Sequence, residues 1–180
     1  MNKFMIETER LKIVPLTYEE VMLYKINRNE LENNSGLKES NSQHTGQFIE
    51  MLENKLLPLL KDKKDDYIFY TIWLATDKIE NAIVCDFGIK GIPDINNEIE
   101  IGYGTQEKYK CRGYMTEAIR GFINWVSCRE DIRAVIAETD KGNIPSVRVL
   151  EKNDFSMYKE TEAAYWWRKE NEKFSTLKSL

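Results

Sequence analysis

Residues 100–126 read EIGYGTQEKYKCRGYMTEAIRGFINWV, and this stretch sets the architecture that the rest of the chain is expected to complete. It continues a strict alternation that begins at Asn97 and ends at Thr105, with Ile99 and Ile101 on one face and Glu98 and Glu100 on the other,. Beyond the next loop, apolar residues recur at helical steps at Met115, Ala118, Ile119, Phe122, Ile123 and Val126,. The pattern predicts a strand, a loop and an amphipathic helix.

The loop between this strand and this helix, within residues 106–118, has the features of an anion-binding site. A helix start leaves several backbone N–H groups free, and the helix dipole adds partial positive charge there, so such a terminus binds phosphate readily. Lys108, Lys110 and Arg112 add cations in an acidic chain, and Gly113 permits a close approach or a positive φ,. These features indicate an anion site, most simply for a diphosphate. Taken alone, local chemistry favours the plainer alternative of a capped helix with solvent-exposed lysines.

The remaining segments give a mixed order of elements. Thr17 and Glu20 form a capping-box pattern for a helix through about residue 27, after a strand over residues 8–16,. A polar connection is expected over 28–46, and Asn143 is placed to cap a helix through about 153,. Further expected elements are a helix over 45–61 and strands over 67–75, 82–89, 133–138 and twice within 155–168,. The order β-α-α-β-β-β-α-β-α-β-β predicts one α/β (α+β mixed) domain over 1–168 and a polar tail over 169–180.

Composition narrows the class of protein. The 180 residues are 42% hydrophobic with a formal net charge of -4, which suits one globular domain and disfavours a nucleic-acid binder,. No apolar run approaches the roughly 18 residues that cross a bilayer, and no secretory signal is recognisable,. The three cysteines are scattered and the chain has one histidine, so neither a metal site nor a disulfide framework is expected,. The cytoplasm is the expected location.

The motifs together resemble one known family. The block over 100–126 resembles the central motif of GNAT acetyltransferases, in particular the RimJ/RimL-like branch that acetylates ribosomal-protein N-termini. NIPSVRVLEKNDF over 143–155 resembles the second motif of that branch, and ETERLKIVPLT over 7–17 resembles its first strand. Two motifs at the expected separation are more specific than either alone.

The resemblance implies a twisted, mostly antiparallel sheet of six to seven strands with a splayed parallel pair in its middle, flanked by about four helices. It also implies acetyl-CoA as co-substrate. The residues it assigns to acetyl-CoA are Tyr103, Gly104, Thr105, Lys110, Cys111, Arg112, Gly113, Tyr114, Met115, Asn143 and Ser146. In this chain Cys111 and Met115 stand where the family has small residues, so their side chains are expected to narrow the phosphate cradle.

Two residues are the predicted catalytic groups. Glu100 lies on the strand just ahead of the expected splay, where a carboxylate can accept the proton of the amine, whereas Glu98 is expected to pair with a basic side chain,. The resemblance gives Ser146 the role of proton donor to the leaving thiolate, because the position of the family's usual tyrosine is Leu150; Tyr158 is a distant second. Cys111 is expected to be an inert filler, not a reactive thiol, and His44 a solvated loop residue.

The resemblance therefore implies an N-acetyltransferase that moves an acetyl group from acetyl-CoA to a primary amine, by direct attack in a ternary complex. The acceptor is a protein N-terminus or a small-molecule amine, and the chain is expected to act as a monomer or homodimer. The alternative is a GNAT-fold protein that binds acyl-CoA without efficient catalysis, as a sensor or interaction module.

Overall fold

A single twisted sheet organises the computed structural model, which describes residues 4–177. Its eight described strands lie in the order β1-β2-β3-β4-β5-β6-β8-β7, and each neighbouring pair is antiparallel except β5 and β6. The strands are β1 (Ile6–Glu7), β2 (Leu11–Pro15), β3 (Ile72–Asp77), β4 (Ala82–Ile89), β5 (Glu98–Thr105), β6 (Ala134–Asp140), β7 (Ser156–Glu160) and β8 (Ala164–Glu170).

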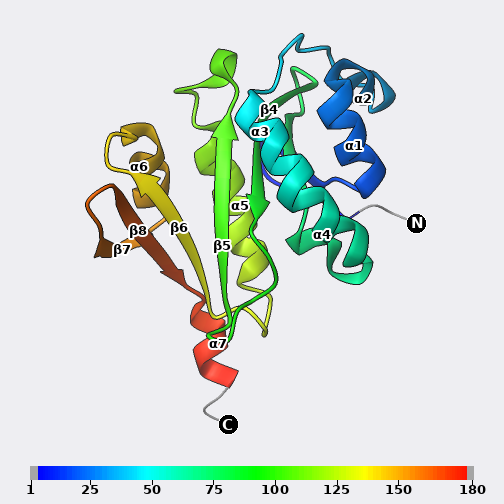
Figure 1. Ribbon diagram of the computed structural model, residues 1–180. Helices are drawn as coiled ribbons and strands as arrows, with labels where there is room; N and C mark the ends of the chain where they lie inside the picture. Colours follow the sequence, from blue (N-terminus) through cyan, green and yellow to red (C-terminus); the bar gives the residue numbers. More distant parts are fainter. Residues whose placement is uncertain (1–3, 178–180) are drawn as a thin grey trace.

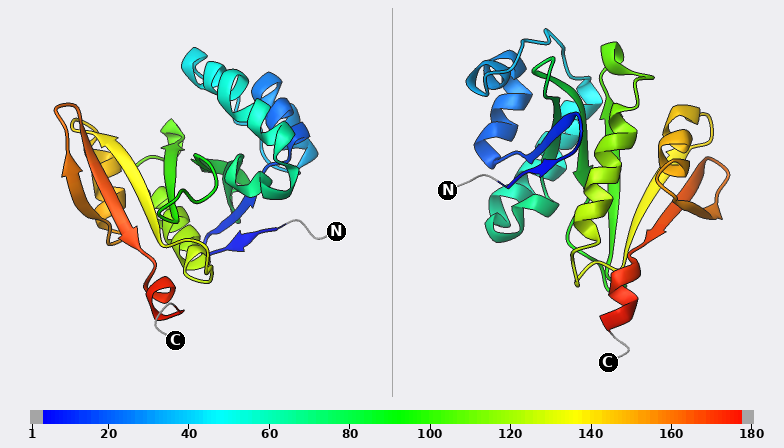
Figure 2. Two further views of the ribbon diagram at one scale, coloured as in Figure 1. Left: turned by 60° about the horizontal axis from the view of Figure 1, so that its bottom comes forward. Right: turned by 180° about the vertical axis from the view of Figure 1, so that it is seen from behind.

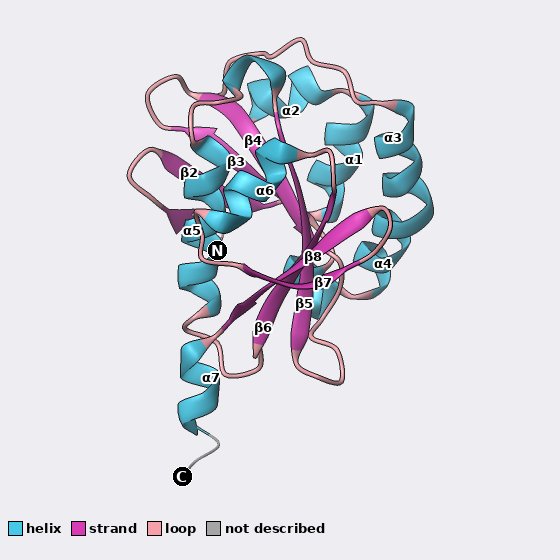
Figure 3. Ribbon diagram, turned by 90° about the vertical axis from the view of Figure 1, so that its left-hand side faces the viewer, coloured by secondary structure: helices cyan, strands magenta, loops and turns pink. Residues whose placement is uncertain are grey.

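Helices cover both faces of the sheet (Figure 3). Helices α5 and α6 lie on one face, and α1 to α4 lie on the other. The helices are α1 (Tyr18–Ile26), α2 (Arg28–Asn34), α3 (Gly46–Met51), the π-helical turn η1 (Leu52–Leu56), α4 (Leu57–Asp62), the 3-10 turns η2 (Lys64–Phe69) and η3 (Glu107–Tyr109), α5 (Tyr114–Val126), α6 (Ile144–Glu151) and α7 (Glu172–Leu177). None of the helices within residues 4–177 is both long and apolar enough to cross a membrane.

The central parallel strands, β5 and β6, diverge halfway along their length. β5 and β6 are paired only from Glu98–Ile101 to the segment Ala134–Ala137. Beyond that point β5 runs on to Thr105 beside β4, while β6 runs on to Asp140 beside β8. The two strands therefore start together and diverge toward their carboxyl ends (Figure 1), and the left-hand view of Figure 2 shows the resulting V. The predicted parallel, splayed pair is confirmed.

The helix starts follow the capping chemistry expected from the sequence. The Thr17 side chain accepts a hydrogen bond from the Glu20 amide and the Glu20 side chain accepts one from the Thr17 amide, which completes the predicted capping box,. Asn143 Oδ1 accepts from the Ser146 amide at 3.2 Å, as expected for the cap of α6,. Both predicted caps are confirmed.

Three segments differ from the sequence-based expectation. The connection over 28–46 contains α2, because Asn27 caps it and the Arg28–Glu32 ion pair, one helical turn apart, lies buried inside the protein,. The strand expected from Tyr67 begins only at Ile72, after the 3-10 turn η2. The helix expected over 45–61 contains the π turn η1, since Pro58 has no N–H for a regular bond to the preceding turn,. With β1, α2 and α7 added and the helix over 45–61 divided into α3 and α4, the described residues hold eight strands and seven α-helices, more than the six to seven strands and about four helices predicted.

Two separate hydrophobic clusters hold the layers on the sheet. One lies between the sheet and α5, where Trp73 stacks on Phe87 with ring centroids 5.5 Å apart and Phe122 packs edge-on against Phe87. The other lies under α1 to α4, around Val21, Tyr24 and the outward side chains of β3 and β4. Fully burying a large apolar side chain contributes about 1.5–3 kcal/mol, so each layer has its own source of stability.

Candidate active site

The loop before α5 presents a set of free amides. Gly113, the residue that caps α5, has φ 77° and Cys111 has φ 60°, so the chain makes two left-handed turns immediately before the helix,. Among the hydrogen bonds of residues 4–177, none uses the backbone amides of residues 111–116 as donors. These amides surround the positive end of the helix dipole, which is the arrangement that binds a phosphate.

The side chains of this loop leave the amides accessible. Met115 is buried in the core under α5 and is only 4% exposed, so it does not narrow the cradle as the sequence led us to expect. The Cys111 side chain is exposed. Lys110 pairs with Glu107 at 2.5 Å and Arg112 with Glu80 at 3.3 Å, both at the surface. Tyr114 is buried, with its ring 5.9 Å from that of Tyr109.

A hydroxyl pair closes the side of the V that faces α5 and α6. Ser146 Oγ donates to Tyr103 Oη at 3.0 Å, and Tyr103 Oη donates to the Ser146 carbonyl at 3.1 Å. Burial raises the pKa of Tyr103 to about 12, so the phenol stays protonated near neutral pH,. The fold thus joins two of the sequence-predicted residues, 43 positions apart, at the point where β5 leaves β6.

The end of β5 offers open backbone. Gly104 and Thr105 pair with Asp86 and Cys85 of β4, while the opposite edge of this segment has no strand partner among the described residues. A Cβ added at Gly104 would meet nothing within 4 Å. Unpaired strand edges of this kind bind extended ligands through backbone hydrogen bonds.

The two glutamates of β5 lie on the face that α1 to α4 cover, and both are ion-paired. Glu98 pairs with Arg168, which confirms the prediction that it serves a basic side chain. Glu100 pairs with Lys90 of the loop after β4, and its side chain is 23% exposed. Tyr158 of β7 is exposed, and its pKa is raised by burial and by the charges of Glu98 and Glu100. Whether Glu100 accepts a proton stays a prediction.

A cavity of about 650 Å³ opens on this same face. Its walls come from the helical segment 46–59 and from β3, β4 and β5, and one carboxylate, that of Asp86, lies in its lining. The lining is mostly apolar: Phe48, Met51, Leu56, Leu59, Tyr70, Ile72, Phe87 and Ile89, with Lys55 and Lys90 as its cations. The volume suits a small organic ligand.

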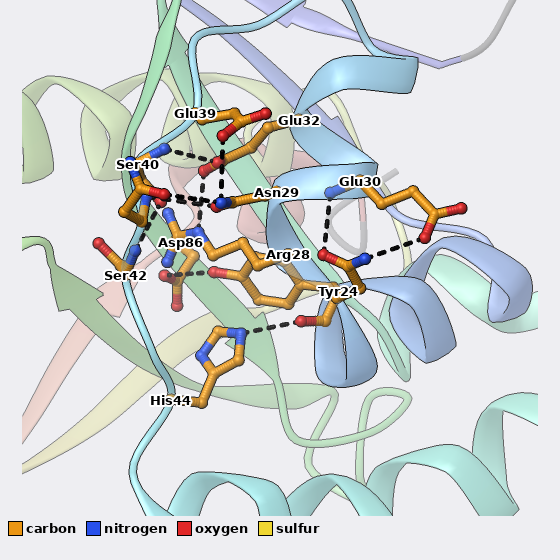
Figure 4. A network of polar contacts seen from close by, with 12 residues as sticks. Tyr24, Arg28, Asn29, Glu30, Glu32, Glu39, Ser40, Ser42, His44 and Asp86 are labelled. Carbon is orange, nitrogen blue, oxygen red and sulfur yellow. Dashed lines mark hydrogen bonds and ion pairs between the residues drawn. The ribbon is translucent and has the colours of Figure 1, made fainter.

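Asp86 also belongs to a network of polar contacts (Figure 4), in which Tyr24, Arg28 and Glu32 are buried. The Tyr24 hydroxyl donates to Asp86 Oδ2 at 3.4 Å, and Arg28 Nε donates to Glu32 Oε1 at 2.9 Å. Burial raises the pKa of Asp86 from 3.8 to about 6, although the charge of Arg28 acts in the opposite direction,. The sequence analysis did not single out Asp86; the available signal was a charged residue inside the otherwise apolar run AIVCDFGI.

His44 belongs to this network as well, so its prediction as a solvated loop residue is wrong. Its Nε2 lies 3.0 Å from the Tyr24 carbonyl, and its ring packs edge-on against Tyr24 with centroids 4.4 Å apart. Burial lowers the pKa of His44 below 6.5. The half-buried position arises because the connection folds back over α1, which the polar composition of residues 35–44 does not reveal. Across the described chain, no group of three or more His, Cys, Asp or Glu residues is arranged to hold a metal ion.

The family description "Acetyltransferase (GNAT) domain" matches residues 10–156. The uncharacterized N-acetyltransferase YjdG of Bacillus subtilis (strain 168) is 35% identical over 95 residues, which cover 52% of this chain and 56% of that protein, so the match spans little more than half of the relative's length.

Two solved structures share the fold. The ribosomal-protein-S5-alanine acetyltransferase of Vibrio fischeri has a TM-score of 0.69 and 18% identity, covering 95% of this chain and 98% of its own. A coenzyme A complex of RimL, a ribosomal L7/L12 alpha-N-protein acetyltransferase, has a TM-score of 0.67 and 14% identity, covering 94% and 99%. At 14–18% sequence identity, this similarity shows a shared fold alone.

Proposed function

The chain belongs to the GNAT acetyltransferase family, and on that premise we propose that it is an N-acetyltransferase that moves an acetyl group from acetyl-CoA to a primary amine. The observation that carries the proposal is the set of free amides at residues 111–116, set beside a strand end that β6 has left open. A diphosphate and an extended pantetheine arm are the two parts of coenzyme A that need such groups.

The residues present fit acetyl-CoA. The amides of 111–116 and the start of α5 suit the diphosphate, with Lys110 and Arg112 as flanking cations,. The backbone of Gly104 and Thr105 suits the pantetheine arm, since the edge that faces the V has no strand partner among the described residues. Tyr114 and Met115 contribute through their amides, because their side chains are buried. The neighbouring structure with bound coenzyme A has the same fold, which supports this assignment.

The amine attacks the thioester carbonyl directly while both substrates are bound. Ser146, oriented by its bond to Tyr103, protonates the departing sulfur,. The amine reaches the open end of the V from the face that carries Glu98 and Glu100, and Glu100 is the proton acceptor predicted from the sequence. Because Lys90 engages Glu100 in this structure, that role requires the two side chains to separate.

Titration with coenzyme A, followed by an assay of thiol release, tests the proposal. At a concentration of one hundred times Kd, coenzyme A is expected to add about 2.7 kcal/mol to the apparent free energy of unfolding, seen as a raised Tm. Acetyl-CoA with a panel of amines should then release free thiol. Binding without turnover on any amine would instead support the alternative of an acyl-CoA sensor, and no Tm shift at all would refute both.

A further inference from the structure

We propose that Asp86 receives the acceptor amine and takes its proton, and that the acceptor is a primary monoamine with an apolar body, seated in the cavity under the helical segment 46–59. The inference rests on the proposed function and names the substrate class of that same site. It assigns to Asp86 a part that the sequence analysis gave to Glu100.

The register of the sheet places Asp86 beside the reaction point. Asp86 is the cross-strand partner of Gly104, so the two residues share one face of the sheet with Cβ positions about 5 Å apart in ordinary geometry,. Because Gly104 has no side chain and nothing else lies within 4 Å of that spot, the space between Asp86 and the open end of β5 is clear. An amine held by Asp86 therefore faces the segment that we propose holds the thioester.

The cavity selects against a second positive charge. Asp86 is the one carboxylate among the described residues that line it, and Lys55 and Lys90 are the charged groups of the opposite sign. A monoamine places its ammonium on Asp86 and its hydrocarbon on Phe48, Met51 and Ile72. A diamine of equal length brings a second ammonium toward Lys55, because Lys90 is already paired with Glu100. The apolar contact favours a hydrocarbon body by about 0.8 kcal/mol per buried CH₂.

The groups around Asp86 suit a proton acceptor. Part of the carboxylate faces the cavity, and the surrounding burial raises its pKa to about 6, close enough to neutrality for base catalysis,. The titratable and charged groups that face it are Tyr24 of α1 and Arg28 of α2. Arg28 Nε in turn donates to Glu32, and the His44 ring packs edge-on against Tyr24.

One nitrogen atom in this network is a hydrogen-bond donor without an acceptor. Arg28 Nη2 is buried and has no hydrogen-bond partner, while Nε of the same side chain is held by Glu32. The guanidinium lies 5.2 Å from the centroid of the Tyr24 ring, next to the hydroxyl that donates to Asp86. The cation keeps Asp86 ionised often enough to accept a proton, so Arg28 is a positioning residue.

The proposed reaction moves the acetyl group from sulfur to nitrogen and removes two protons from the ammonium. The carboxylate of Asp86 takes one proton from the ammonium, which frees the nitrogen lone pair. That pair forms the N–C bond with the thioester carbonyl carbon, and the C–S electron pair leaves with sulfur. Asp86 releases this first proton to water in the cavity and then takes the second proton that nitrogen loses as the C–S bond breaks. Ser146 gives its proton to sulfur and regains one from water, so that one proton in all is released.

The test uses hexylamine and hexane-1,6-diamine as probes, with acetyl-CoA as donor. We expect the wild-type protein to acetylate hexylamine with a kcat/KM at least tenfold above that for the diamine. Asp86→Asn should lower kcat/KM for hexylamine roughly 100-fold or more at pH 7. It should also weaken binding of hexylamine alone, measured by calorimetry, while Kd for coenzyme A stays close to wild type and Tm does not fall. Asp131→Asn, at an exposed carboxylate paired with Arg129, is the matched control and should change nothing.

Two further measurements keep the proposal open to refutation. Lys55→Glu, at the exposed rim of the cavity, should raise kcat/KM for the diamine relative to hexylamine at least fivefold, even if Asp86→Asn folds poorly. If Asp86→Asn binds coenzyme A and keeps more than a third of wild-type activity, while Glu100→Gln loses most of it, Glu100 is the base and the inference is wrong. If wild type fails to bind coenzyme A, the proposed function itself fails.

Discussion

The ionised carboxylate of Asp86 lowers the free energy of unfolding, because burial disfavours its charged form,. The folded-state pKa of Asp86 is about 6 and its ordinary value is 3.8, so the folded protein holds this proton over a pH range in which the unfolded chain has lost it. Below pH 3.8 both states are protonated and the residue contributes no difference. As pH rises through that window the unfolded state gains relative stability, and above pH 6 the full penalty is present.

We therefore expect Asp86→Asn to stabilise the protein at pH 7.5 but not at pH 3.5. The gain should be on the order of 2 kcal/mol, which allows for the part of the carboxylate that faces water. Urea denaturation at both pH values measures it, with Asp131→Asn as reference. An equal effect at the two pH values would show that the buried charge is not its cause.

The hydrogen-bonded hydroxyls of Ser146 and Tyr103 allow a second prediction, about the effect of single substitutions on kcat. Ser146→Ala should lower kcat about tenfold to 100-fold while leaving Kd for coenzyme A within about threefold, because it removes the proton donor but keeps the Asn143 cap,. Tyr103→Phe should show a smaller loss, since the Ser146 hydroxyl remains. Stopped-flow thiol release reports kcat, and Ser156→Ala on the exposed strand β7 is the control. A loss of binding equal to the loss of rate would contradict the assignment.

Single residues also show where sequence reasoning stops. The caps at Thr17 and Asn143 were predictable because their hydrogen bonds join residues three apart,. Asp86 and His44 were not predicted, because their partner Tyr24 lies 62 and 20 residues away and reaches them only in the folded chain. Met115 was misjudged for a related reason: its side chain points into the core, which only the rotation of α5 determines.

At the scale of elements, the turn before α5 is the unit that the strand, loop and helix pattern predicted best. The amides of 111–116 are free as that pattern required, and the splay of β5 from β6 follows the family resemblance. The helix over 45–61 was predicted as a regular α-helix, whereas Pro58 follows the π turn η1. A π turn changes the direction of the side chains in and after it, here Leu56 at its end and Leu59 beyond it in the cavity wall,.

Cys111 gives this element a direct test. A left-handed φ of 60° costs a side-chain-bearing residue roughly 1–2 kcal/mol, and glycine relieves that cost,. We expect Cys111→Gly to keep or slightly raise stability and to tighten Kd for coenzyme A about twofold to fivefold, because glycine adopts the left-handed turn that presents the amides without strain. Cys111→Ala is the matched control, since alanine keeps the strained φ. If Gly and Ala bind alike, the backbone at 111 does not limit the cradle.

In the proposed reaction, the whole molecule divides donor binding and acceptor binding between the two faces of one sheet. The loop 106–113, α5 and α6 lie on the face of the proposed donor site, and the cavity with Asp86 lies under α1 to α4, with its own hydrophobic cluster. The sequence predicted a sheet flanked by helices. Which helices cover which face, and which layer carries the proposed acceptor cavity, depended on long-range packing that no short motif encodes.

Hydrogen exchange should separate the two faces. Coenzyme A alone is expected to slow exchange of amides in 102–116 and 143–147, because it occupies the free donors and the open strand edge. Hexylamine alone should slow exchange in 46–59 and 86–90, where the cavity walls lie. Mass spectrometry of peptides from each region measures both effects. Protection by coenzyme A centred on residues 46–59 would reverse the assignment of faces.

The independence of the cluster beneath α1 to α4 has a practical side. Since the hydrophobic cluster under those helices is separate from the one under α5, substitutions at Met51, Leu56 or Leu59 should reshape the cavity proposed for the amine. The proposed coenzyme A site would keep its framework. A library of variants at these three residues would be screened for activity on other amines, while the proposed acetyl-CoA site stays unchanged. Such a protein is a natural starting point for making amide-forming catalysts to order.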